Sequence, residues 1–172
     1  MAITQVPAAQ TGGMTLLSTT TLSGATTTVS NLPQNYIDLI IDVYGATWNT
    51  GDDSCAFETN ITSAVGVNKM NVSTVSTPEN LATRITALDD ASQNQKRTGG
   101  NNFFRFTFNN YASTTDYKTY SIRGSYEGAS NNGRMINMFG GIASDTAMSS
   151  FTFRTGNGHT LTAGTIKVYG VR

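Results

Sequence analysis

The stretch YIDLIIDVYGATW, residues 36–48, decides the fold class of this chain. β-branched and aromatic residues dominate it and helix-favouring residues are scarce, which predicts a β-strand. Its apolar positions are too dense for a strand with one solvated face, so we expect it to lie at the centre of a sheet and to be buried. Pro33 and Asn35 interrupt the pattern before it, and the polar turn NTGDD, residues 49–53, follows it.

Period-2 alternation, the pattern of a strand with one buried face, recurs along the rest of the chain. The clearest example is FFRFTF, residues 103–108, which places three phenylalanines on one face. The last eight residues, TIKVYGVR, also form a predicted strand, with Ile166 and Val168 in the core. The other residues expected on buried faces are Cys55, Phe57, Tyr120, Ile122, Phe151 and Phe153.

Composition points to the same fold class. Charged residues make up 13% of the 172 residues, about half of the roughly 25% usual in globular proteins, and Thr, Ser, Asn and Gly fill the other polar positions. These residues suit strands and tight turns. We predict an all-β chain of about eight strands, a two-sheet sandwich of jelly-roll type, with a closed barrel as the next alternative. Residues 14–172 form one sandwich domain, and residues 1–13, MAITQVPAAQTGG, form an extended N-terminal arm.

Three local predictions depend on weaker patterns. The Ser23-Gly24 dipeptide between the Thr-rich segments 15–22 and 25–32 predicts a hairpin. In PENLATRITALDD, residues 78–90, a short helix over about 79–88 competes on equal terms with an edge strand. Residues 91–102, ASQNQKRTGGNN, are polar after the first and predict an exposed, mobile loop.

Charge and targeting signals exclude several classes of partner. The chain has 11 Lys and Arg against 11 Asp and Glu, and no basic run, which argues against nucleic-acid binding. It has no run of about 20 apolar residues that could cross a membrane and no signal peptide, so we expect it to be made and kept in a cytosol. A near-neutral surface favours association, which suits a protein that works in an assembly.

The residue types that carry chemistry are few and scattered. His159 is the single histidine, in the turn GNGHT, where we expect it to be exposed, and no Gly-x-Ser-x-Gly motif supplies a nucleophile. The single cysteine, Cys55, excludes an internal disulfide and is expected to act as a small buried apolar residue. We therefore predict no enzyme activity and no cofactor. Two alternatives stay open, namely a calcium ion at residues 52–53 or 89–90 and a carbohydrate-active enzyme that uses Asp52, Asp53 and Glu58.

Aromatic residues near polar loops could form a sugar-binding platform or a subunit interface. The candidates of this kind are Trp48, Tyr44, Tyr111, Tyr117 and Tyr126. The N-terminal arm is expected to dock on a neighbour. The predicted interface residues are Ile3, Val6, Pro7, Trp48, Tyr111 and Tyr117.

Two segments near the ends of the chain are GMTLLSTTTLSGATTTVSNLPQNYIDLIIDVYG, residues 13–45, and TAGTIKVYGV, residues 162–171. They resemble the corresponding segments of a family of small bacteriophage virion proteins. Residues 49–102 carry none of this resemblance. The resemblance implies a non-enzymatic virion structural protein with a jelly-roll fold, commonly a homotrimer, that is assembled in the host cytoplasm.

Two roles are compatible with that resemblance. A capsid decoration, or cement, protein would bind major capsid subunits and stabilise the shell. Alternatively, a tail or fibre component would contact host-surface glycans. The resemblance implies no catalytic residues in this chain.

Overall fold

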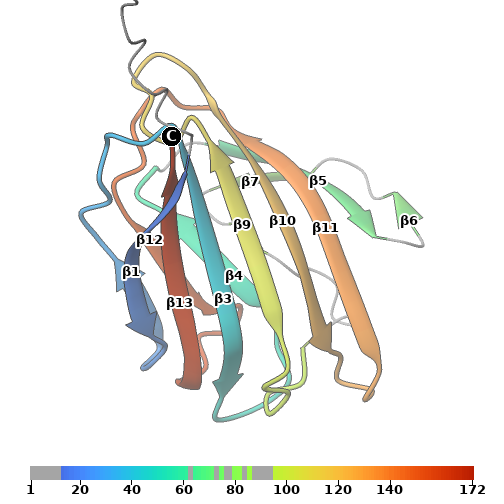
Figure 1. Ribbon diagram of the computed structural model, residues 1–172. Helices are drawn as coiled ribbons and strands as arrows, with labels where there is room; N and C mark the ends of the chain where they lie inside the picture. The colour runs from blue at the N-terminus through green and yellow to red at the C-terminus, as the bar shows by residue number, and fades with distance from the viewer. Residues whose placement is uncertain (1–12, 62–63, 72–73, 76–78, 83–84, 87–94) are drawn as a thin grey trace, which may run out of the picture.

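The computed structural model describes residues 13–61, 64–71, 74–75, 79–82, 85–86 and 95–172, and within them every regular element is a β-strand. Figure 1 shows the strands in two layers, with the smaller sheet behind the larger one. All the strand pairs are antiparallel. The prediction of an all-β, two-sheet sandwich is confirmed.

The larger sheet holds nine of the described strands in the order β1-β13-β3-β9-β10-β11-β5-β6, and β7 also pairs with β5. Six long strands, from β1 to β11 in that order, lie side by side in Figure 1. The bounds are β1 (Met14–Thr21), β3 (Asp38–Trp48), β5 (Ala64–Asn71), β6 (Thr74–Val75), β7 (Glu79–Ala82), β9 (Phe103–Asn109), β10 (Lys118–Glu127), β11 (Gly133–Ile142) and β13 (Leu161–Val171).

The smaller sheet has the order β2-β12-β4-β8. Its strands are β2 (Thr26–Val29), β4 (Cys55–Thr59), β8 (Ile85–Thr86) and β12 (Phe151–Thr155). Early strands pair with late strands in both sheets: β1 with β13, β2 with β12, β3 with β9 and β4 with β8. The chain therefore crosses between the sheets repeatedly, which ties both layers into one unit.

Aromatic stacking between the layers holds the centre of the sandwich. Phe57 of β4 stacks on Phe106 and Phe108 of β9, with ring centroids 4.6 and 5.5 Å apart, and on Phe151 of β12 at 4.7 Å. The side chains predicted for buried faces are all in this core: Cys55, Phe57, Phe104, Phe106, Phe108, Tyr120, Ile122, Phe151, Phe153, Ile166 and Val168. In these segments alternation identified the buried face correctly because one face of each strand packs on the other sheet.

The predicted N-terminal hairpin is wrong. β1 pairs with the C-terminal strand β13, and β2 pairs with β12 in the other sheet, so Ser23 and Gly24 form a corner between sheets. Gly24 adopts a positive φ of 71°, and its carbonyl oxygen accepts a hydrogen bond of 2.7 Å from the Leu161 amide. A corner and a hairpin turn use the same residue types, so the dipeptide could not distinguish them.

The helix alternative for residues 79–88 is also wrong where the structure describes them. Residues 79–82 are β7, paired with β5, and residues 85–86 are β8, paired with β4. The apolar spacing of this segment fits both periods, and pairing with β5 and β4 decided between them.

The loop prediction for residues 91–102 holds only in part, and residues 91–94 lie outside the described ones. Gln95 and Asn102 are buried, and their side-chain amides both donate to the Ala46 carbonyl oxygen, at 3.0 and 2.8 Å. Asn102 Oδ1 also accepts from the Ala46 amide. Two buried amides therefore hold this segment against β3, and it is not uniformly exposed.

Candidate functional site

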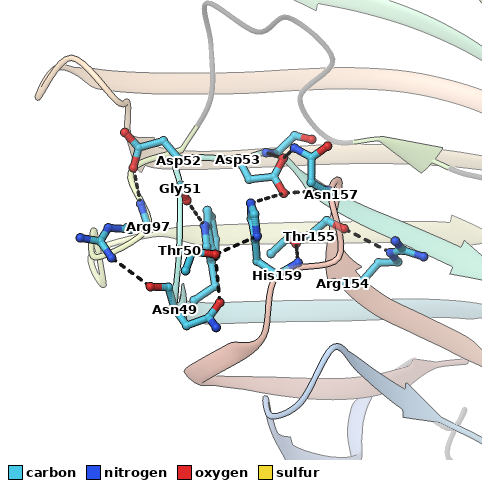
Figure 2. A network of polar contacts seen from close by, with 12 residues as sticks. Asn49, Thr50, Gly51, Asp52, Asp53, Arg97, Arg154, Thr155, Asn157 and His159 are labelled. Atoms are coloured by element: carbon cyan, nitrogen blue, oxygen red, sulfur yellow. Dashed lines mark hydrogen bonds and ion pairs between the residues drawn. The ribbon is translucent and has the colours of Figure 1, made fainter.

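Asp52, Asp53 and His159, three of the side chains considered for catalysis, lie where the β3–β4 loop approaches the β12–β13 turn (Figure 2). Figure 2 shows residues 49–53 from the first segment facing Thr155, Asn157 and His159 from the second, with Arg97 closing one side. Thr50 and His159 are 109 positions apart in the sequence. Strand pairing brings the two segments together. β4, which follows the first segment, pairs with β12, and the second segment connects β12 to β13.

Asp53 is the centre of this network and is 2% exposed. Its Oδ1 accepts hydrogen bonds from the Ser54 amide at 2.8 Å and from Asn157 Nδ2 at 2.9 Å, and its Oδ2 accepts from the Asn157 amide at 2.8 Å. A buried carboxylate requires such donors to offset its lost hydration. The two hydrogen bonds from Asn157 attach the β12–β13 turn to the segment that leads into β4.

His159 lies between Asp53 and Thr50. Its Nε2 is 3.7 Å from Asp53 Oδ2, and its Nδ1 is 3.1 Å from the Thr50 hydroxyl. Its side chain is 25% exposed, so the expectation of an exposed turn histidine holds only in part. The three residue types match a nucleophile, base and acid. However, 3.7 Å is beyond hydrogen-bond length, and both Asp53 oxygens already accept other donors, which fits a turn-stabilising network better than a catalytic triad.

The predicted catalytic carboxylates occupy different environments. Asp52 Oδ1 accepts from the Arg97 amide at 2.9 Å, while Asp53 is bound to Asn157. Glu58 lies five residues further on, about 16 Å along an extended chain, where Arg154 Nη1 is 3.6 Å from its Oε1. The three carboxylates are thus bound to three different partners, Arg97, Asn157 and Arg154.

Among the described residues, no group of three or more His, Cys, Asp or Glu side chains is placed to hold a metal ion. Residues 89–90 lie outside the described ones.

Cys55 is buried, as its sequence context predicted. Its Sγ donates to Gln95 Oε1 at 3.3 Å, and burial, with a smaller effect of the Asp53 charge, raises the pKa of the thiol. A raised pKa keeps the sulfur in the unreactive thiol form.

Two of the predicted interface residues are buried in the core, so the expectation that they meet a partner is wrong. Trp48 is 2% exposed, and its Nε1 donates to the Gly51 carbonyl oxygen at 2.6 Å. Tyr111 has no exposed surface, and its hydroxyl donates to the Pro33 carbonyl oxygen. Both are large aromatic residues with one polar atom, and one hydrogen bond to a backbone carbonyl lets such a residue be buried. Tyr126, at 3% exposed, is buried as well.

Tyr117 does project into solvent, with 68% of its surface exposed, and Tyr44 is 37% exposed. Both therefore stay candidates for a contact with another molecule. The predicted arm residues Ile3, Val6 and Pro7 lie outside the described residues.

The surface that sequence reasoning missed is the outer face of the larger sheet, the face turned away from the smaller sheet. Met14, Leu16, Met135 and Phe139 lie on this face and are 52%, 53%, 67% and 42% exposed. Alternation could have assigned each of them to a solvent-facing side of its own strand. It could not show that β1 and β11, more than 100 residues apart, are in one sheet.

An ion pair stands at the centre of this outer face. Arg105 of β9 binds Asp42 of β3 through two hydrogen bonds of 2.7 Å, from Nε to Oδ1 and from Nη2 to Oδ2. The Tyr44 hydroxyl donates to Asp42 Oδ2 at 3.0 Å. The hydrogen bond to Asp42 raises the pKa of Arg105, and burial followed by the Asp42 contact raises the pKa of Tyr44. Asp42 is 1% exposed, covered by its partners.

In comparisons with known proteins, no protein-family model, curated protein or solved structure matched the chain. The described residues include no helix long and apolar enough to span a membrane.

Proposed function

We propose that this protein is a non-enzymatic structural component of a bacteriophage virion, a capsid decoration protein that stabilises the shell by binding major capsid subunits. It would be assembled in the host cytoplasm, as a homotrimer, and would bind neither nucleic acid nor membrane. The proposal begins from the resemblance of residues 13–45 and 162–171 to small virion proteins.

The order of the strands is the observation that carries the proposal. Eight of the strands form four nested pairs. β1 pairs with β13, β2 with β12, β3 with β9, and β4 with β8. These eight strands form the run β1-β13-β3-β9 in the larger sheet, which continues beyond β9 through β10, β11 and β5, and the order β2-β12-β4-β8 in the smaller sheet. This wrapped pairing supports the proposal of a jelly-roll fold, an architecture that viral capsid domains use. A jelly roll by itself hosts many functions, so the surface must supply the rest of the argument.

The surface supports an assembly role. Large apolar side chains project from the outer face of the larger sheet, whereas free monomers rarely expose extended apolar patches. The formal net charge of zero removes the repulsion that would keep copies apart.

The alternative role, a tail or fibre component that contacts host-surface glycans, is supported among the predicted aromatics by Tyr44, which is 37% exposed, and more strongly by Tyr117. Its ring is 68% exposed and can offer a stacking surface to a sugar. Trp48, the residue that favoured this role most in the sequence, is buried and gives it no support.

Particle analysis tests the proposal. Purified virions are expected to contain this chain, and particles that lack it are expected to rupture sooner under heat and osmotic shock. Immunogold labelling should decorate the capsid faces. Labelling confined to tails or fibres would establish the alternative role, and unchanged stability of particles without the protein would refute the role in reinforcing the shell.

A further inference from the structure

The outer face of the larger sheet is organised in rows of side chains that cross five or six strands. One row runs, by strand register, through Thr165, Tyr44, Phe103, Ser125 and Met135. The next row holds Lys167, Asp42, Arg105, Arg123 and Asn137. A third row holds Leu16, Tyr169, Ile40, Thr107, Ser121 and Phe139. A charged row thus lies between two rows rich in aromatic and aliphatic residues.

This composition is that of a protein–protein interface. The buried centres of interfaces are enriched in aromatic residues, Met and Arg and depleted in carboxylates. On this face Tyr44 and Phe103 pack together with ring centroids 5.1 Å apart, and Met135 and Phe139 project nearby on β11. A sugar site would combine aromatic rings with many polar groups, whereas aliphatic and Met side chains here favour a protein.

The charges of the face select the kind of partner. Arg105 and Arg123 stand directly opposite each other on β9 and β10, an arrangement that costs stability within the chain. Arg105 is engaged with Asp42, whereas Arg123 is exposed on β10. Lys167 lies over the Tyr44 ring at 5.7 Å. An incoming carboxylate beside Arg123 would offset the repulsion.

A second copy of the chain fits this face poorly. Face-to-face pairing would bring the same arginines and lysine toward each other, because the carboxylate in that row is already bound by Arg105. A different, acidic chain has the complementary charge.

The size of the face is sufficient for a stable contact. Six strands at a spacing of about 4.8 Å, each contributing about seven residues, cover on the order of 700 Å². A standard interface buries about 800 Å² on each partner.

We infer that the outer face of the larger sheet is a docking surface for another protein that presents a carboxylate flanked by apolar side chains. This inference rests on the proposed function, and within it the partner surface belongs to the capsid shell. Arg123 would receive the carboxylate, and Phe139 and Met135 would pack on the apolar side chains.

The test uses particles stripped of this protein and measures rebinding of the purified chain by cosedimentation. Phe139→Asp and Arg123→Ala change the outer face of the larger sheet. Thr28→Asp and Arg154→Ala make the same changes in charge on the smaller sheet, where Thr28 and Arg154 lie on strands β2 and β12. We expect the first pair to weaken binding by about tenfold or more and the second pair to leave it within about twofold. Thermal unfolding of each variant checks that it is folded.

The outcomes separate the inference from the proposed function. If the wild-type chain does not rebind stripped particles, the proposed function fails and the inference fails with it. If the wild type rebinds and the outer-face variants rebind equally well, only the docking surface is refuted. Loss of binding in the smaller-sheet pair alone would place the contact on the opposite face. Sedimentation that shows loss of self-association in Phe139→Asp would identify a second copy as the occupant, against the inference.

Discussion

At the scale of single residues, two buried tyrosines contrast in one respect. The Tyr111 hydroxyl donates to Pro33, whereas the Tyr120 hydroxyl is buried without a hydrogen-bond partner among the described residues. Both rings belong to the core. The net contribution of each hydroxyl to stability should therefore have opposite sign, because a buried unpaired hydroxyl has lost its hydration without compensation.

Replacing each tyrosine by phenylalanine tests this contrast. We expect Tyr111→Phe to lower the free energy of unfolding by about 0.5–1.5 kcal/mol, and Tyr120→Phe to leave it unchanged or raise it by about 1 kcal/mol. Guanidinium chloride denaturation of both variants measures the difference. Equal losses in the two variants would show that Tyr120 has a partner in solution.

Alkaline pH should destabilise the protein through buried groups that stay protonated. Burial raises the pKa of Tyr120 and Cys55 in the folded chain. Their unfolded forms ionise near ordinary values, so the stabilisation is complete below about pH 8 and is lost as pH rises through the region above about 9. Over this pH range, each such group lowers the free energy of unfolding by about 1.4 kcal/mol for each pH unit.

The measurement is the free energy of unfolding between pH 7 and 11. Tyr120→Phe should give a shallower alkaline decline than the wild type, because one of these groups is removed. An unchanged slope would mean that Tyr120 ionises in the folded state.

At the scale of elements, the C-terminal strand β13 joins the edge strand β1 to the rest of the larger sheet. It pairs with β1 on one side and β3 on the other, and its Ile166 and Val168 are fully buried. Gly170 lies so close to the Tyr36 ring that an added Cβ would clash with it. Removing β13 would expose the edges of two strands and open the core.

Truncation at Thr165 is therefore expected to abolish the cooperative unfolding transition. Circular dichroism during heating measures this transition. Deleting Arg172 alone removes an exposed residue beyond the strand and should leave the melting temperature within a few degrees of the wild type. A truncated chain that still melted cooperatively would show that β1 and β3 can close the sheet without β13.

Predicting elements from the sequence succeeded where a strand has one buried face and failed where the partner strand matters. The phenylalanines of β9 were assigned to the correct face because every second residue of the strand is apolar and buried. The first hairpin was predicted wrongly because β1 pairs with a strand almost 150 residues away. No local pattern encodes that partner.

At the scale of the whole molecule, Phe57 joins the two sheets by stacking on Phe106 and Phe108 of β9, and it also stacks on Phe151 of its own sheet. Phe57→Ala should reduce the free energy of unfolding by about 3–5 kcal/mol through lost burial and a residual cavity. Chemical denaturation measures this loss. Tyr117→Ala, at an exposed aromatic of similar size, should stay within about 0.5 kcal/mol of the wild type, and an equally small effect at Phe57 would contradict the stacked core.

The sequence by itself determined the all-β class, the buried face of each strongly alternating strand and the burial of Cys55, because these depend on residues close together in the chain. Only the tertiary structure decided that Trp48 and Tyr111 are internal, since backbone carbonyls of Gly51 and Pro33 accept their polar hydrogens. It also decided which strands share the outer face of the larger sheet. This face is formed by β1, β13, β3, β9, β10 and β11, which come from distant parts of the chain. The alternation of apolar residues within one strand shows which face is buried but does not show which strands lie beside it.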